Sequence, residues 1–182
     1  MATRTDAFGF AALDWVGLLG FMAISHVAGA LGGMDTRLAV RSEWYKKLNK
    51  SPANPPNWVF GLMWALLFTL MAVAVFLVWQ DNGIRFPQYY NVSIALWSVM
   101  VVINAIWMSV FFGMQWFTTA LVILILQLML SIAVTILFFL QQIVAGVLMI
   151  PLCVWLCFAT YLNGYVVFSN REEACRSGRT RV

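Results

Sequence analysis

Charged residues are scarce in this sequence. Only 10% of the 182 residues are Asp, Glu, Lys or Arg, whereas 63% are hydrophobic, and the mean hydropathy is +0.85. A soluble domain usually carries about 25% charged residues, so this chain has too little polar surface to enclose its apolar residues in water. The composition therefore predicts an integral membrane protein, with residues 1–182 forming a single domain.

Several kinds of reactive cluster are also absent. The sequence shows no paired-carboxylate site, no Ser-His-Asp set and no phosphate-binding glycine loop. It contains one histidine, His26, and three cysteines without a disulfide spacing, so we expect no metal site and no disulfide framework. His26 is either a neutral imidazole satisfied inside the bundle or a ligand-binding residue. The basic residues flank apolar segments, which argues against nucleic acid as a partner.

Five apolar segments reach the roughly 20 residues that a membrane-spanning helix needs. They cover residues 8–31, 58–80, 89–113, 117–140 and 144–168. Very short links follow the third and fourth segments, and short links join antiparallel neighbours. The predicted fold is therefore an all-α, up-and-down bundle of five transmembrane helices. Alternation of polar and apolar residues is missing, which excludes a spanning β-barrel.

Lys and Arg are distributed unevenly between the two ends of these segments. One end carries only Arg4 and Arg85, while the other carries the basic residues of the first loop, 32–57, and of the tail, 169–182, which we expect to be flexible. The positive-inside rule then predicts that the first loop and the C-terminus are cytoplasmic.

The first loop ends in the proline-rich sequence Ser51-Pro52-Ala53-Asn54-Pro55-Pro56. Proline fixes φ, lacks an N–H and pushes the preceding residue out of the helical region. We therefore expect an ordered, non-helical strap between the first two spans, with Pro56 in or next to the first turn of the second.

Aromatic and amide side chains are abundant inside the spans. By helical spacing, Trp64 and Phe68 share one face of the second span, and Asn104, Trp107 and Phe111 share one face of the third. On the fifth span the shared face holds Trp155, Ala159, Leu162 and Asn163. Such stripes either form a packed core or line a pocket for a flat apolar ligand with a few polar groups.

Three of these stretches resemble motifs of the TspO/MBR family, which comprises tryptophan-rich sensory proteins and translocator proteins, the latter also called peripheral benzodiazepine receptors. The stretches are WYKKLNKSPANPPNWVFGLMW at 44–64, N..W..VFFG at 104–113 and P...W...AT.LN at 151–163. The resemblance implies a five-helix membrane protein, often dimeric, of bacterial envelopes or mitochondrial outer membranes. It also implies a pocket under the first loop that binds porphyrin, haem or a sterol as a ligand, with no cofactor required.

The stripes and the resemblance together give a set of candidate ligand-binding residues. They are Trp58, Phe60, Trp64, Phe68, Asn104, Trp107, Phe111, Trp155, Ala159, Leu162 and Asn163. Some members of the family promote light-dependent porphyrin breakdown, and Trp64 and Trp155 are the candidates for that activity. A weaker sterol motif is formed by Leu162, Tyr165 and Arg171, although the last two also fit ordinary interface anchors.

The strap departs from the family pattern at Ala53, where a tryptophan is usual, and at Ser51, where a proline is usual. The loss of the loop tryptophan favours a binding protein over a porphyrin-degrading enzyme. Three functions therefore stay open: a receptor or transporter for a hydrophobic small molecule, a photo-oxidative enzyme, and an accessory subunit of a larger membrane complex. Membrane lipid and a second copy of the chain are the other expected partners.

Overall fold

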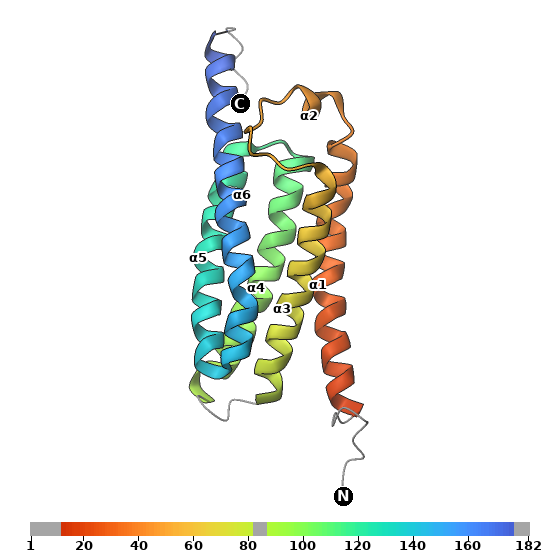
Figure 1. The fold of residues 1–182 in the computed structure, drawn as a ribbon, viewed down its shortest axis with the longest axis vertical. Coiled ribbons are helices and arrows are strands. Elements are labelled where there is room, and N and C mark those ends of the chain that lie inside the picture. The colour runs from red at the N-terminus through yellow and green to blue at the C-terminus, as the bar shows by residue number, and fades with distance from the viewer. Residues whose placement is uncertain (1–11, 82–86, 177–182) are drawn as a thin grey trace, which may run out of the picture.

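A computed structural model of the chain describes residues 12–81 and 87–176, and every regular element in these two ranges is helical. The five long helices run side by side (Figure 1). They are α1 (Ala12–Ala39), α3 (Asn57–Asp81), α4 (Pro87–Met108), α5 (Phe117–Gln141) and α6 (Ile143–Arg176). Two short elements, α2 (Glu43–Lys47) and the π-helical turn η1 (Ser109–Gly113), complete the set.

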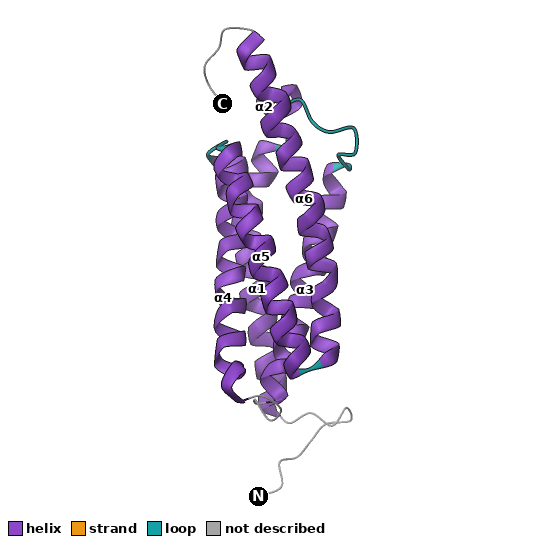
Figure 2. Cartoon of the chain, turned by 90° about the vertical axis from the view of Figure 1, so that its left-hand side faces the viewer, coloured by secondary structure: helices purple, strands orange, loops and turns teal. Residues whose placement is uncertain are grey.

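All five long helices are long and apolar enough to cross a membrane. The prediction of an all-α, multi-pass membrane protein is therefore confirmed, and Figure 2 shows only helices and connecting loops in the described residues. Helix α1 packs against α3 and α4, α6 packs against α3, and α5 lies between α4 and α6. The short links before and after α5 thus join antiparallel neighbours, as expected from their length.

Two helix boundaries differ from those expected. Helix α1 continues to Ala39, so the first loop proper begins only at Val40. The reason lies at Gly32, where a Cβ would stand 2.7 Å from the sulfur of Met108; the glycine lets α1 run on in close contact with α4. Helix α6 also continues, to Arg176, so the tail expected at 169–182 is helical over 169–176. Residues 8–11 of the first predicted span lie outside the described residues.

The core fills the space between α3, α4, α5 and α6. Its largest fully buried side chains include Trp97, Phe138, Leu67 and Met71. Buried Gln127 on α5 donates from Nε2 to the carbonyl oxygen of Met100 on α4, 3.1 Å away. Close packing and a few interhelical hydrogen bonds of this kind hold helices together in lipid, where hydrophobic burial gives little drive.

The end of α4 is widened into the π-helical turn η1. The Met114 N–H donates to Ser109 O at 2.9 Å, five residues back, and the Trp116 N–H donates to Val110 O at 3.1 Å. Gln115 closes this turn with φ 60°. A π-turn changes the faces that successive residues present, and here both Phe111 and Phe112 reach the pocket beneath the first loop.

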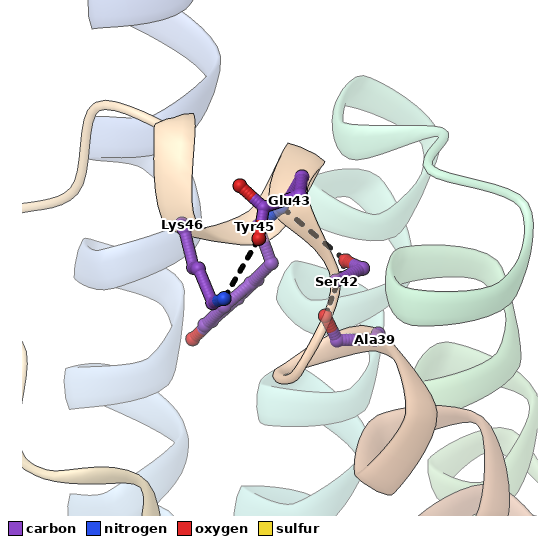
Figure 3. A network of polar contacts seen from close by, with 5 residues as sticks. All are labelled: Ala39, Ser42, Glu43, Tyr45 and Lys46. Atoms are coloured by element: carbon purple, nitrogen blue, oxygen red, sulfur yellow. Dashed lines mark hydrogen bonds and ion pairs between the residues drawn. The ribbon is translucent and has the colours of Figure 1, made fainter.

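The short helix α2 positions the first half of the loop. Its N-cap, Ser42, accepts a hydrogen bond from the Tyr45 N–H at 3.4 Å and donates to Ala39 O at 2.5 Å (Figure 3). Glu43 and Lys46 form an exposed ion pair of 2.7 Å, a type that contributes little stability. The cap directs Tyr45 into the bundle, where only 7% of its surface is exposed.

The proline-rich strap after α2 is non-helical, as predicted. Residues 48–56 contain no helix, and the Asn54 N–H closes a turn on Ser51 O at 2.9 Å. Helix α3 then begins at Asn57, directly after Pro56.

Candidate functional site

A cluster of tryptophans joins three helices below the loop. Trp64 of α3 lies with its ring centroid 6.0 Å from that of Trp107 on α4 and 6.3 Å from that of Trp155 on α6. Phe68 extends the cluster along α3, 5.8 Å from Trp64, and Phe60 lies 5.7 Å from Trp155. The predicted stripes on the second, third and fifth spans therefore do meet in one aromatic cluster.

On the α6 side of this cluster lies a small cavity, which we call the inner pocket. Its volume is about 40 Å³. It is lined by Tyr45, Leu48, Lys50, Asn54, Phe60, Trp107, Phe111, Phe112, Ala159, Leu162, Asn163 and Val166. The inner pocket is thus roofed by the first loop and walled by α3, α4, η1 and α6.

On the α1 side lies a much larger cavity, which we call the outer cavity. Its volume is about 550 Å³, within the range of roughly 300–1,000 Å³ that is typical of small-molecule sites. Its lining includes His26, Gly29, Ala30, Gly33, Thr36 and Arg37 of α1 together with Gly61, Trp64, Ala65 and Phe68 of α3. Tyr45, Phe60, Trp107 and Phe112 line both cavities and form the wall between them.

Several buried polar atoms around the cluster have no hydrogen-bond partner among the described residues. They include both amide atoms of Asn104 and the Nε1 atoms of Trp107 and Trp155. Asn104 is only 1% exposed, and an unsatisfied buried polar group costs about 1–3 kcal/mol. A ligand or a water molecule with polar atoms of its own would satisfy such groups.

Asn163, by contrast, is satisfied within the bundle. In the orientation that suits both of its amide atoms, it donates to Phe117 O and accepts from the Leu121 N–H, each at 3.1 Å. It therefore ties α6 to the first turn of α5 at the wall of the inner pocket.

Lys50 brings a positive charge to the roof of the inner pocket. Its Nζ lies 4.3 Å from the centroid of the Tyr45 ring and donates a hydrogen bond to Tyr45 O. Burial lowers the pKa of Lys50 and raises the pKa of Tyr45, because desolvation disfavours the charged form of each. The roof therefore places the Lys50 cation over the face of the Tyr45 ring, next to the apolar residues that line the inner pocket.

The strap is fastened to α6 at two points. Buried Ser51 lies with its Oγ 3.1 Å from Tyr161 Oη. The Asn49 N–H donates to Asn170 Oδ1 at 3.1 Å, and Asn170 Nδ2 donates to Asn49 O at 3.0 Å. Ala53, in the middle of the strap, is exposed.

The structure brings most of the predicted site residues to the two cavities. Phe60, Trp64, Phe68 and Trp107 line the outer cavity, whereas Phe60, Trp107, Phe111, Ala159, Leu162 and Asn163 line the inner pocket. Trp155 lines neither cavity but contacts Phe60 and Trp64. Asn104 is buried one helical turn before Trp107.

Trp58 is not brought to the site. Its side chain is 69% exposed, and it lines neither cavity. Trp58 precedes Trp64 by six residues, which is about 240° around an α-helix, so the two rings leave α3 on different faces. Its exposure at the end of an apolar helix fits an interface anchor.

The residues of the sterol motif do not gather on one outward surface of α6. Leu162 is 7% exposed and faces the inner pocket, while Tyr165 is half-buried. Arg171 belongs to α6 by its backbone, and its side chain is outside the described part of the molecule.

Apart from the ligand-binding role that was one of two alternatives for His26, the contribution of α1 to the site was not predicted from the sequence. His26 and Arg37 both line the outer cavity, and their separation of eleven residues is close to three full turns of a helix. That spacing, with Gly29 and Gly33 between them, is the signal that could have indicated a shared face. Tyr45, Lys50 and Phe112 were also missed as lining residues, although each lies in or beside a recognised motif.

His26 is held within the bundle by two contacts. Its Nδ1 lies 2.9 Å from Met22 O, and its Nε2 lies 3.3 Å from Thr69 Oγ1. Since a carbonyl oxygen can only accept, Nδ1 carries the proton in this arrangement. Among the described residues, no three His, Cys, Asp or Glu side chains gather as a metal-binding group.

Comparisons with known proteins match nearly the whole chain. The model of the TspO/MBR family matches residues 21–168. A protein of Cereibacter sphaeroides named tryptophan-rich sensory protein is 34% identical over 151 residues, covering 83% of this chain and 89% of the relative. The translocator protein of Homo sapiens is 32% identical over 168 residues, covering 91% of this chain and 95% of the relative.

Proposed function

This chain belongs to the TspO/MBR family, and from that premise we propose that it is a membrane receptor or transporter that binds a flat hydrophobic ligand, a tetrapyrrole or a sterol-like molecule, beneath its first loop. The observation that carries this proposal is the aromatic wall of Phe60, Trp107, Phe112 and Tyr45 between two cavities. Aromatic rings can stack on a flat ligand. The unpartnered polar atoms of Asn104, Trp107 and Trp155 nearby would be satisfied by the polar groups of such a ligand, directly or through water.

The proposal also covers the orientation of the protein, the membrane that holds it and its assembly. The charge distribution supports an orientation with the first loop and C-terminus in the cytoplasm. Relatives of this chain occur in bacteria and in mammals, which fits either a bacterial envelope membrane or the mitochondrial outer membrane. A homodimer or a larger membrane complex would be its assembly.

Ligand binding can be tested through tryptophan fluorescence. Titrating the purified full-length protein with protoporphyrin or haem should quench the fluorescence in a saturable way. Replacing Trp107, which lines both cavities, by Phe should reduce the quenching. Trp116→Phe is the matched control, because Trp116 is 60% exposed and lines neither cavity. A linear, non-saturable response in the wild type would refute the proposal.

A sterol ligand is distinguished by competition. If the site takes a sterol in preference to a tetrapyrrole, cholesterol added at equal concentration should restore the tryptophan fluorescence that protoporphyrin quenches. An unchanged signal would restrict the proposal to tetrapyrroles.

A second candidate function is light-dependent breakdown of a porphyrin. It is favoured by Trp64, which has Trp107 and Trp155 on either side with ring centroids 6.0 and 6.3 Å away, because an indole is an oxidisable electron donor. Illumination in air should bleach protoporphyrin faster with the wild type than with a variant carrying both Trp64→Phe and Trp155→Phe. Equal bleaching rates would exclude this activity and leave binding alone.

The remaining alternative, an accessory subunit, is decided by purification from native membrane. Recovery of the chain in a stable complex with other proteins would support it. Recovery as a monomer or homodimer that carries a pigment would count against it.

A further inference from the structure

Helix α1 is the most exposed of the five long helices. Only 11% of its most apolar stretch is buried, whereas the other four bury 33–50% of theirs. It touches α3 where a Cβ on Gly17 would lie 2.6 Å from the Trp79 ring and a Cβ on Gly29 would lie 2.3 Å from the Phe68 ring. Helix α1 therefore meets the bundle through small residues and presents most of its surface to lipid.

The exposed side of α1 is an apolar stripe that ends in two arginines. Near the loop the stripe consists of Leu31, Met34 and Leu38, all exposed, with Leu38 exposed by 76%. Arg37 and Arg41 are exposed as well, and the Arg41 N–H still bonds to Leu38 O at 3.3 Å, so the helical course continues to it. Residues three or four apart share a helix face, which places both guanidinium groups beside the end of the stripe.

The described residues offer these two arginines no carboxylate. The ion pair in this part of the chain joins Lys46 to Glu43, and neither Arg37 nor Arg41 has a partner among the described residues. Asp35, whose side chain is not described, precedes Arg37 by two residues and so lies about 200° away around α1. The helix dipole favours a cation in the last turn and falls off beyond it, so it accounts for Arg37 better than for Arg41.

The depth of the arginines in the membrane follows from the packing of α1 on α3. Gly29 faces Phe68, and the two helices run in opposite directions (Figure 1). At about 1.5 Å per residue, Leu38 lies about 14 Å from Gly29 towards the loop, and Trp58 lies about 15 Å from Phe68 in the same direction. Leu38 and Trp58 are therefore at nearly the same depth. Since exposed Trp58 fits an interface anchor, Arg41, one turn beyond Leu38, is at the depth of the lipid headgroups.

We propose that the loop end of α1 binds an anionic phospholipid of the leaflet beside the first loop, with the phosphate on Arg37 and Arg41 and the acyl chains along the exposed stripe. The planar fork of a guanidinium group matches a phosphate, and a basic residue at the membrane surface enriches anionic lipid about fivefold. The inference does not depend on the ligand proposed above, because Leu38 and Arg41 line neither cavity. The bound lipid holds the end of α1, from which the first loop starts, at the membrane surface.

The site is tested with a photo-reactive residue in the full-length protein. Benzoylphenylalanine replaces Leu38 in one protein and Trp58 in the matched control, which is exposed at nearly the same depth on α3. Both proteins are illuminated in vesicles of equal parts phosphatidylglycerol and phosphatidylcholine, and the mass of the intact protein identifies the attached lipid. Phosphatidylglycerol should exceed phosphatidylcholine about fivefold at position 38, and the two lipids should attach equally at position 58.

The role of the two arginines is tested in the protein that carries the probe at position 38. Arg37→Gln together with Arg41→Gln should make the attachment of the two lipids equal. Lys46→Gln together with Lys47→Gln removes the same charge from exposed residues of α2 and should preserve the excess of phosphatidylglycerol. Attachment of phosphatidylcholine is the internal standard for the position of α1 in the membrane.

Three outcomes would overturn the inference. The first is equal attachment of both lipids at position 38 in the otherwise unchanged protein. The second is the same excess of phosphatidylglycerol at positions 38 and 58, because the whole basic end of the bundle would then attract the lipid. The third is an equal loss of the excess in the arginine pair and the lysine pair, because net charge alone would then explain it.

Discussion

Tyr45 connects the first loop to both cavities. Its backbone N–H is held by the Ser42 cap (Figure 3). Its ring lies beneath Lys50, and its side chain forms part of the wall between the cavities. Tyr45 thus anchors the first loop, which roofs the inner pocket, to the helix bundle beneath it.

The titration of Tyr45 gives a pH prediction. Burial raises its pKa above the ordinary value of 10.0, so its stabilising contribution is complete below pH 10.0 and is lost as the pH rises through the higher folded value. Above that pH the loop should become more accessible to proteolysis. Tyr45→Phe keeps the ring and removes the hydroxyl, so its loop should lose less protection as the pH is raised above 10.0.

Lys50, the neighbouring titrating group, has the opposite sign. Its pKa is lowered from 10.5, so its deprotonation stabilises the folded loop as the pH rises towards 10.5. The wild type and the Tyr45→Phe variant both keep Lys50, so the difference between their proteolysis profiles reports the ionisation of Tyr45. Identical alkaline proteolysis profiles would contradict the prediction.

Gln115 carries the only positive φ, 60°, found for a non-glycine residue in the described ranges. A side chain in the left-handed region costs roughly 1–2 kcal/mol, and a β-branched one costs more. Gln115→Gly should therefore keep or raise the free energy of unfolding in detergent, while Gln115→Ile should lower it by about 1–2 kcal/mol. Equal stability of the two variants would show that the turn after η1 relaxes to another conformation.

At the scale of elements, the strap is attached to the bundle mainly through α6. The contacts of Ser51 with Tyr161 and of Asn49 with Asn170 join it to the same helix. The strap therefore moves with α6, while Tyr45 and the end of α1 form the other side of the roof.

Removing the Asn170 attachment should loosen the strap. Asn170→Ala deletes two hydrogen bonds to Asn49, each worth about 1 kcal/mol. Amide hydrogen exchange at Ala53 and Asn54, whose N–H groups bond within the strap, should then accelerate about tenfold. Ser169→Ala is the control on the same turn. Unchanged exchange at both amides would mean that Ser51 and Tyr161 hold the strap alone.

At the scale of the whole molecule, the five helices enclose the site only at one end. Both cavities lie beside the loop, whereas the fully buried Trp97, Phe138 and Met71 belong to the core and line neither cavity. The bundle thus combines a packed part with a hollow part, and the loop covers the hollow part.

The proposed orientation can be checked by cysteine labelling of cells. In a chain whose three cysteines are replaced by alanine, Ala53→Cys in the exposed strap should react with an impermeant maleimide only after permeabilisation. Gln88→Cys, which is exposed at the opposite end of the bundle, should react in intact cells. The reverse labelling pattern would place the first loop outside the cytoplasm.

The sequence by itself determined the fold class and much of the aromatic cluster. Long apolar segments allow only spanning helices, because lipid leaves no other way to satisfy the backbone. Helical spacing placed Trp64 with Phe68, and Asn104 with Trp107, on common faces, since both relations lie within one helix. The motifs around these residues also identified the family.

Only the tertiary structure decided which faces meet. Trp58 and Trp64 are both tryptophans of α3, yet only Trp64 meets α4 and α6, because each face of a helix meets a different neighbour. The role of α1 also depended on which helix faces meet in the bundle. His26 and Arg37 became parts of one site only when Gly29 and Gly32 let α1 pack closely on Phe68 and Met108. Such contacts between distant segments depend on packing across helices, which the spacing of residues along one helix does not contain.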